Sequence, residues 1–581
     1  MMKTSRRYRH PLVWPWTRAL VVLLVATALT VSAEPTEHPL LDILAGEMAL
    51  SMDKLVGPDG TKPYYLQYWV TDQRTVNVSA TLGSIAGERE NHTRLLDVDL
   101  RCGGYALDNT HQIRGAGYFG GYDRRGGWAY LPLDGDPLAT RQAIWLKTDQ
   151  QFKSALKRLA QVQANVKVKV EEDDPSDDFS REDANVHIGP WVEQPYDLAE
   201  LKARVKRYSE RFRAHPLIYS STVSVTGSIS NRLAVSSEGS RLQFGQGWWR
   251  IGIQASTIAE DGMELWQYTS FDSHTLAGLP DDAEVIAGVD RVIADVLALR
   301  DAPVVDPYTG PAILLNRASG VFFHEIFGHR IEGHRQKDVD EGQTFAKKID
   351  QEVLPTFLSM VDDPSLRTFK NIELNGYYAF DEECVASRPV SLVEDGVLKT
   401  FLLSRSPTRG FTKSNGHGRR QPGSRVVARQ GNLIIRSTKQ VTFDELRTLL
   451  MDECKKQGKE YGLLFEDISG GFTSTRRTGP QSFKVLPIMV YRVFADGRPD
   501  ELVRGVDIVG TPLTCFSKIL ITADDPGVFN GVCGAESGSV PVSAISPSIL
   551  VEQIEIEKKR KAQDRPPILE APIASASGQS Q

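Results

Sequence analysis

The chain has 581 residues, 41% of them hydrophobic and 24% charged, and a formal net charge of −6. This length exceeds one ordinary domain and predicts two large ones, and the composition is typical of a soluble globular protein with an ample core. No internal stretch approaches the ~20 apolar residues that a membrane-spanning helix needs, which excludes an internal membrane span.

The first 33 residues have the pattern of a signal peptide. An apolar run at 19–31 follows a basic region that contains no acidic residue, and Val31-Ser32-Ala33 matches a small-x-small cleavage site. The basic residues are Lys3, Arg6, Arg7, Arg9 and Arg18. We expect cleavage after Ala33 and export to the bacterial periplasm or the medium, by the general or the twin-arginine route, with an uncleaved membrane anchor as the alternative. Cleavage takes the net charge to −11, and such an acidic mature protein is not expected to bind nucleic acid. After signal cleavage, no membrane partner is expected.

Residues 34–303 are predicted to form an N-terminal domain that is rich in strands. The segment TVNVSATLG at 75–83 alternates between apolar and polar residues, as a half-buried strand does. Residues 218–271 predict a meander of strands, separated at the turn pairs Glu238-Gly239 and Asp261-Gly262.

Three helices are expected among these strands. Residues 149–160 place apolar side chains on one stripe behind Asp149 as a candidate N-cap, and residues 197–212 show the same periodicity. A third helix is expected at about 282–300. The segment 300–311, with its three prolines, predicts the domain boundary between 303 and 304.

Residues 304–557 are predicted to form the second domain, again from strands and helices. A hairpin is expected about Asp395-Gly396. Residues 442–458 predict a helix that begins with a capping box, Thr442 with Glu445, and stops at its final glycine. Cys454 lies on the apolar stripe of that helix and is expected in the core.

The chain becomes polar from 558 to 581, which predicts a disordered tail. Both predicted domains mix strands with helices. The predicted fold class is therefore α+β, with two domains made of mixed β-sheets and packed helices.

The segment FFHEIFGHRIEGHRQ at 322–336 contains three of the eleven histidines. His324, Glu325 and His329 form His-Glu-x-x-x-His, one residue longer than the His-Glu-x-x-His of zinc peptidase helices. Residues five apart on an α-helix differ by roughly 140°, so two such histidines cannot bind one ion from a straight helix. A shared metal site therefore requires the helix, capped in our prediction by Ser319, to distort or end near Gly328. A helix with surface histidines is the alternative.

A catalytic zinc takes three protein ligands and leaves one position for water, so two histidines are too few. Glu332 and His334 are nearby candidates for the third ligand. A distant candidate comes from the odd number of cysteines, since in an oxidising compartment at least one is left unpaired. Cys533 lies in a loop of small residues, where a thiolate can approach a metal closely. Glu325 is then free to act as general base.

Several segments together resemble the TldD/PmbA family of metallopeptidases, specifically its metal-binding TldD-type member. They are HEIFGHRIEG, NGHGRRQPGSR, ISGGFTSTRRTGPQSF, ELVRGVDIVGTP and GVCGAESGSVPVSAISPSILVEQIEI, within residues 305–557. The resemblance implies the two-domain architecture of that family. It also implies Zn²⁺ held by His324, His329 and Cys533, with Glu325 as the base.

The resemblance further implies a dimer that encloses the active site and admits short or unfolded peptides. The partner is either a second copy or a paralogous subunit. The other cysteines are then free or joined in up to two disulfides: Cys102, Cys384, Cys454 and Cys515.

Two features depart from the family pattern. Its usual Leu-Glu-Gly-Asp is replaced by Ile331-Glu332-Gly333-His334, and we expect the extra histidine to be exposed. The familiar members are cytoplasmic, whereas this chain has an export signal.

The sequence therefore predicts an exported zinc metallopeptidase in which Glu325 activates the water that the zinc holds. A non-catalytic subunit that holds peptides, and a zinc hydrolase of a non-peptide amide, are the alternatives. Cobalt or iron could occupy the same ligands. Candidates for a second oxyanion donor are His417, Arg419 and Arg420, unless their loop is simply a solvated basic turn.

Overall fold

The computed structural model describes residues 35–113, 127–167, 174–338, 341–476, 483–510, 515–559 and 565–577. The predicted signal peptide, residues 1–33, lies outside these ranges. From Thr36 onward, contacts unite the chain into one compact unit. Among the described helices, none is long and apolar enough to cross a membrane.

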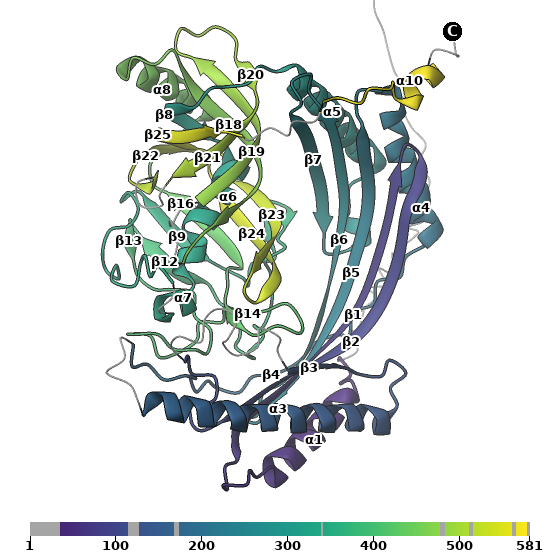
Figure 1. Cartoon of the computed structure of the whole chain (residues 1–581), viewed down its shortest axis with the longest axis vertical. Helices are drawn as coiled ribbons and strands as arrows, with labels where there is room; N and C mark the ends of the chain where they lie inside the picture. Colours follow the sequence, from purple (N-terminus) through teal and green to yellow (C-terminus); the bar gives the residue numbers. More distant parts are fainter. Residues whose placement is uncertain are drawn as a thin grey trace, which may run out of the picture. The chain divides into compact units, whose positions relative to one another are not determined.

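The N-terminal half builds a long, curved and mostly antiparallel sheet (Figure 1). Its strand order is β3-β2-β1-β5-β6-β4, with β7 also paired to β6. β1 and β2 form one hairpin, which turns at Leu82-Gly83 where both φ angles are positive. The strands are β1 (Pro63–Thr81), β2 (Ser84–Cys102), β3 (Gly127–Tyr130), β4 (Val186–Ile188), β5 (Ser220–Ser236), β6 (Arg241–Ile258) and β7 (Glu264–Ser273).

The predicted strands of this half are confirmed, with one addition. The segment 75–83 is the second half of β1 and its turn, and the predicted meander is β5, β6 and β7. Gly239 and Gly262 take positive φ at its two turns. The sequence does not predict β2, because the first half of that strand is charged and exposed and therefore lacks alternation.

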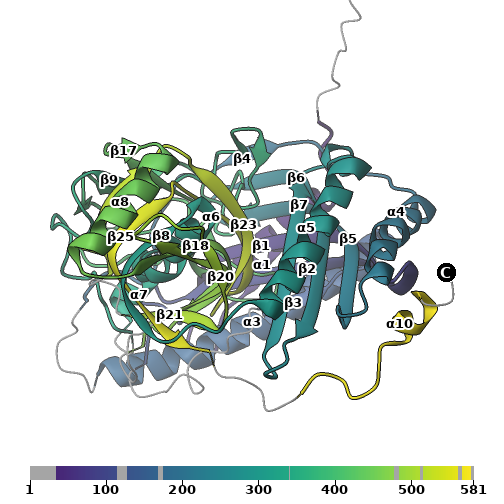
Figure 2. The ribbon, with the colours of Figure 1, turned by 90° about the horizontal axis from the view of Figure 1, so that it is seen from above.

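Helices pack on one face of the sheet and at one end of it (Figures 1 and 2). α4 (Leu198–Glu210), the short 3-10 helix η1 (Arg211–Ala214) and α5 (Asp282–Asp301) bury an apolar core against β1, β5 and β6. α1 (Leu40–Lys54) and α3 (Pro137–Val166) share a second core with β1 and β2. A one-turn 3-10 helix, η2 (Leu276–Gly278), precedes α5.

The predicted helices at 197–212 and 282–300 are confirmed as α4 and α5, and Asp197 caps α4 through the N–H of Ala199. The predicted N-cap of the first helix is wrong. Helix α3 begins at Pro137, with Asp136 as its cap, and Asp149 lies in its middle, paired with Lys153. Two of the buried positions in its first half are threonines, which weakens the apolar periodicity there.

The C-terminal half contains a closed ring of strands. The ring is formed by strands that pair in succession, β8, β18, β19, β21 and β25, and it closes because β25 also pairs with β8. Figure 2 shows this ring end-on. β20 and the pair β17–β22 extend its sheet. The strands are β8 (Tyr308–Leu314), β17 (Gln440–Val441), β18 (Tyr461–Thr473), β19 (Phe483–Phe494), β20 (Glu501–Val503), β21 (Val506–Gly510), β22 (Ile519–Ala523) and β25 (Ile549–Lys558).

A second sheet of this half has the order β13-β12-β9-β16-β24-β23, which leaves β23 at its edge. Helix α6 (Asn316–Ile326) packs between β18 of the ring and the strands β23 and β24. The sheet strands are β9 (Leu358–Asp362), β12 (Val390–Glu394), β13 (Val397–Leu398), β16 (Asn432–Ser437), β23 (Gly527–Ala535) and β24 (Gly538–Ser546). The short pairs are β10 (Thr368–Phe369) with β11 (Ile372–Glu373), and β14 (Gly418–Arg419) with β15 (Val427–Ala428).

Local predictions in this half hold. The hairpin β12–β13 turns at Asp395-Gly396, and α8 (Phe443–Lys456) begins with both hydrogen bonds of its capping box. Cys454 is fully buried on that helix. All five cysteines of the chain are free thiols in the structure.

The predicted boundary falls between α5 and β8, and the strands of the N-terminal sheet all precede it. Independent folding of the two halves stays a prediction, since they belong to one compact unit. The predicted tail contains a short helix, α10 (Pro572–Ser577), so this part of it is helical in the structure.

Candidate metal centre

The helix that carries the histidine motif ends where the motif requires. α6 stops at Ile326, and the 3-10 helix η3 (Gly328–Ile331) follows it. This change of helix type brings the ring centroids of His324 and His329 within 5.1 Å of each other. The prediction that Ser319 caps this helix is wrong. α6 begins at Asn316, so Ser319 lies inside the helix, where its hydroxyl hydrogen-bonds the hydroxyl of Ser546 on β24.

Gly328 is needed at this break because a neighbouring side chain approaches its backbone. A Cβ atom at this position would lie 1.9 Å from Oε1 of Gln430. The other end of that amide, Nε2 of Gln430, lies 3.5 Å from the carbonyl of His324. Gln430 therefore fills the space beside the helix end that a larger residue at 328 would need.

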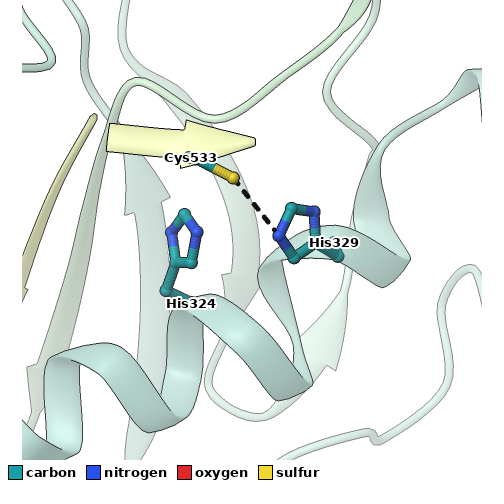
Figure 3. Close-up of side chains that lie close together, drawn as sticks. All are labelled: His324, His329 and Cys533. Atoms are coloured by element: carbon teal, nitrogen blue, oxygen red, sulfur yellow. Dashed lines mark hydrogen bonds between the residues drawn. The ribbon is translucent and has the colours of Figure 1, made fainter. Parts of the chain in front are cut away.

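The third member of the group comes from the edge strand β23. Sγ of Cys533 lies 3.3 Å from Nε2 of His329, and possible ligand atoms of Cys533, His324 and His329 all lie within 4.8 Å of one another (Figure 3). All three side chains are buried. Two imidazoles and one thiolate at such distances fit a single tetrahedral ion, and this donor set suits zinc.

The charges of the centre favour the thiolate. Burial alone would raise the pKa of Cys533, but the imidazoles of His329 and His324 hold it well below the usual value. Burial would lower the pKa of His329, yet Cys533 and Glu332 raise it well above the usual value. The cysteine is thus held in the form that binds a metal.

Glu332, a candidate for the third ligand, takes a different place. Its fully buried carboxylate lies 3.3 Å from Nδ1 of His329, on the opposite side of the ring from Cys533. Arg335 donates to it at 2.8 Å. Burial would raise the pKa of Glu332, but His329 and Arg335 lower it to about 2. A carboxylate in this position orients the imidazole toward a metal.

Arg429 holds the cysteine strand from behind. Its fully buried guanidinium donates to the carbonyl of Cys533 at 2.7 Å and to the Ser537 hydroxyl and the Gly538 carbonyl in the following turn. The sequence does not reveal this role, because a buried arginine and a solvated one have the same local pattern.

The expectation that His334 is exposed is wrong. Its ring is half-buried and pairs with Glu536, which the β23–β24 turn brings alongside, and Glu536 also accepts from Arg335 at 2.9 Å. Possible ligand atoms of His334, Glu536 and Glu332 come within 4.8 Å of one another. Arg335 already supplies the positive charge between the two carboxylates, so this group does not need a cation.

Glu325 borders the cavity described below, and its side chain is mostly buried. Within the described ranges, its carboxylate has no hydrogen-bond or salt-bridge partner. The backbone of Gly471 lies against it, since a Cβ atom there would be 2.9 Å from Cγ of Glu325. The position next to His324 and the free carboxylate suit a general base.

A cavity of about 1150 Å³ opens beside these residues. One side is formed by α6, β18, β23 and the residues after η3, and the other by strands β6 and β7 of the N-terminal sheet. Arg250 of β6 pairs with Asp272 and donates to the carbonyl of Asn530 on β23 at 3.3 Å. The sequence cannot predict this wall, because the two halves meet only in the folded chain.

In the polar loop, residues 415–425, Arg425 borders this cavity, whereas His417, Arg419 and Arg420 do not. His417 is fully buried and lies 3.2 Å from Asp362, while Arg419 donates to the carbonyl of Gln430. Arg420 is buried next to Asp97 of β2. These three side chains are therefore neither oxyanion donors at the cavity nor part of a solvated basic turn. They are buried and hold the loop against Asp362, Gln430 and Asp97.

Comparisons with known proteins extend this geometry. Residues 307–558 match the PmbA/TldA metallopeptidase C-terminal domain. The chain is 30% identical over 275 residues to a metalloprotease of Archaeoglobus fulgidus, a match that covers 46% of this chain and 58% of the relative. It is 25% identical over 281 residues to a zinc metalloprotease TldD homolog of Saccharolobus solfataricus, covering 48% and 57%. The chain thus spans little more than half the length of these relatives.

The solved structure of TldE from Thermococcus kodakarensis has the same fold. The TM-score is 0.56 at 16% identity, over 89% of this chain and 100% of that one. The predicted α+β fold is therefore confirmed.

Proposed function

This chain belongs to the TldD/PmbA family of metallopeptidases, and on that premise we propose that it is a zinc-dependent peptidase that hydrolyses short or unfolded peptides, with Glu325 as general base. The main support is the meeting of His324 and His329 with Cys533, which lies 204 residues beyond His329. A chance cluster of histidines gives no reason for a distant thiol to join them.

The residues of the chain divide the chemistry as follows. When bound, Zn²⁺ supplies a Lewis acid that polarises the scissile carbonyl and lowers the pKa of a coordinated water. Glu325 accepts the proton of the attacking water and returns it to the leaving amine. Glu332 orients His329, and Arg429 fixes the backbone of Cys533, so the ligands are placed before the substrate arrives.

Metal content measured by mass spectrometry tests the ligand set. We expect about one zinc per chain in the wild type, and its loss or strong weakening in Cys533→Ser. Cys515→Ser is the matched control, since this cysteine lies outside the ligand group. Zinc retained in both variants would remove Cys533 from the site.

Peptide turnover tests the reaction. The wild type is expected to cleave unstructured peptides and Glu325→Gln to bind zinc without cleaving them. No metal in the wild type, even after zinc is supplied, would leave a peptide-holding subunit. Zinc without peptide cleavage would point to another amide as the substrate.

Export and assembly are proposals that rest on the sequence and the family resemblance. We expect the mature chain to begin at Glu34 outside the cytoplasm, which N-terminal sequencing of the exported protein tests. We also propose a homodimer or a heterodimer with a paralogous subunit. Native mass spectrometry of the purified protein distinguishes the two assemblies.

A further inference from the structure

The cavity beside the metal centre has an aromatic wall, which consists of Trp266, Tyr268 and Phe472. Trp266 and Tyr268 lie two residues apart on β7 and therefore on one face of that strand, with ring centroids 5.7 Å apart. Phe472 lies on β18, and all three border the cavity. The metallopeptidase chemistry proposed above uses none of them.

Phe472 is unusual because it is large, apolar and 59% exposed inside a cavity. Val532 of β23, next to Cys533, borders the same cavity and is 60% exposed. Exposed apolar side chains scattered on a convex surface are common, but a group of them in a concave site is typical of a binding surface.

The aromatic wall lies close to the proposed base. The backbone of Gly471 touches the Glu325 side chain, and Phe472 is the next residue. Trp266 also lines a small second cavity together with Ser469, which places β7 against this part of β18. Tyr268 interacts with Arg317 in the first turn of α6, the helix that carries Glu325. A substrate whose scissile bond meets Glu325 therefore has neighbouring side chains within reach of the wall.

The other end of the cavity is charged, but its charges are already paired. His334 pairs with Glu536, Arg335 with Glu341, and Lys337 lies 3.9 Å from Asp178. These groups gain little from a charged substrate side chain, because binding one would disrupt existing pairs. Phe472 of the aromatic wall, in contrast, is 59% exposed, so an apolar side chain of a substrate gains by covering its ring.

We propose that the aromatic wall is a side-chain subsite that selects peptides with an aromatic or long aliphatic residue next to the scissile bond. This inference rests on the proposed peptidase function and names its substrate class. The wall selects by burial of apolar surface, since Phe472 has no polar side-chain atom and the phenol of Tyr268 is already engaged by Arg317.

Turnover of a matched peptide series tests the subsite. The zinc-loaded protein is assayed with unstructured peptides that differ at one residue beside the cleaved bond: Phe, Leu, Ser, Lys or Asp. For the wild type we expect kcat/KM to be about tenfold or more higher for Phe and Leu than for Ser, Lys and Asp. Equal values across the series would overturn the proposal.

Variants assign the preference to the wall. Phe472→Ser should bring the Phe-to-Ser ratio toward one, while Phe472→Leu should keep most of it, and Trp266→Leu should reduce it independently. Trp145→Ser is the control, because Trp145 on α3 is 53% exposed but does not border the cavity. An unchanged ratio in Phe472→Ser and Trp266→Leu would place the preference elsewhere and refute the subsite.

Binding separates this inference from the peptidase function. Fluorescence polarisation with labelled forms of the same peptides is measured on Glu325→Gln. If the wild type cleaves no peptide yet Phe and Leu peptides bind about tenfold more tightly, and Phe472→Ser abolishes that difference, the subsite stands and the peptidase proposal fails. If peptides are cleaved but bind and react without preference, the peptidase proposal stands and the subsite fails.

Discussion

Two histidine- and arginine-rich segments of the C-terminal half look alike in sequence and differ in the structure. The metal segment, residues 321–336, ends a helix at the cavity and presents His324, Glu325 and His329 beside it. The polar loop, residues 415–425, reaches the cavity only with Arg425, and its histidine is fully buried. Polar side chains in a family-like motif thus meet at the candidate metal centre in one segment and pack against buried partners in the other, and only their partners distinguish the two cases.

The largest effect is expected in the metal segment. Glu325→Gln should lower kcat by about a thousandfold, because the base is removed while the ligands remain. Zinc content and the midpoint of urea unfolding should stay at wild-type values, since the described structure gives the carboxylate no hydrogen-bond or salt-bridge partner. A variant that loses zinc or stability along with activity would show that Glu325 has a packing role, which would erase the contrast between the segments.

The opposite pattern is expected in the polar loop. Asp362→Ala should lower the free energy of unfolding by about 4 kcal/mol, because His417 and the N–H groups of Gly431 and Asn432 lose a buried acceptor. Urea denaturation of the purified protein measures this loss. The variant that remains folded should still bind zinc. Loss of zinc at wild-type stability would instead connect the loop directly to the metal.

A pH-dependent effect is expected where the polar loop meets the N-terminal sheet. Burial raises the pKa of Asp97 from 3.8 to about 6, although Arg420 and the N–H of Gly423 oppose it. Glu382 and Lys147 are the other charged groups that face it. The folded protein therefore holds this proton more tightly than the unfolded chain, and the free energy of unfolding should fall by about 2 kcal/mol as pH rises from about 4 to about 6.

Asp97→Asn should flatten this part of the stability curve, since it keeps the acceptor for Gly423 and removes the titration. Urea unfolding at several pH values compares the variant with the wild type. The same slope in both proteins would assign it to another group.

The smallest effect is expected beside the ligands. Glu332→Gln should weaken zinc binding by about tenfold, because the amide still contacts His329 but no longer attracts its ring proton as a carboxylate does. Competition with a chelator measures the change. Glu341→Gln is the control, since Glu341 pairs with the same Arg335 without touching a ligand. Equal losses in both variants would place the effect in Arg335.

Much of the metal segment follows from the sequence. Two histidines five residues apart, His324 and His329, can share a metal only if the helix breaks between them. Gly328 predicts the place of this break, and in the structure the 3-10 helix begins at Gly328. Strands with alternating patterns, glycine turns and the capping box at Thr442 are likewise local features that local sequence determines.

What the sequence does not predict depends on contacts between distant segments. The place of Glu332 behind His329 rather than among the ligands depends on Arg335 and Arg429, and the burial of His334 depends on Glu536. The aromatic wall comes from strands of both halves. The sequence does not predict β2 for a different reason. The first half of this strand is charged and exposed, so it lacks the alternation of apolar and polar residues that indicates a half-buried strand.

The hydrogen bond from Arg250 to the carbonyl of Asn530 joins the N-terminal sheet to the strand of Cys533, three residues before the ligand. The centre is therefore not a module that can be cut from the chain and expected to work alone. An engineer who transplanted residues 304–557 onto another scaffold would carry over all three candidate ligands and the candidate base Glu325. The transplant would leave behind an anchor of the edge strand and the rings of Trp266 and Tyr268, which border the cavity.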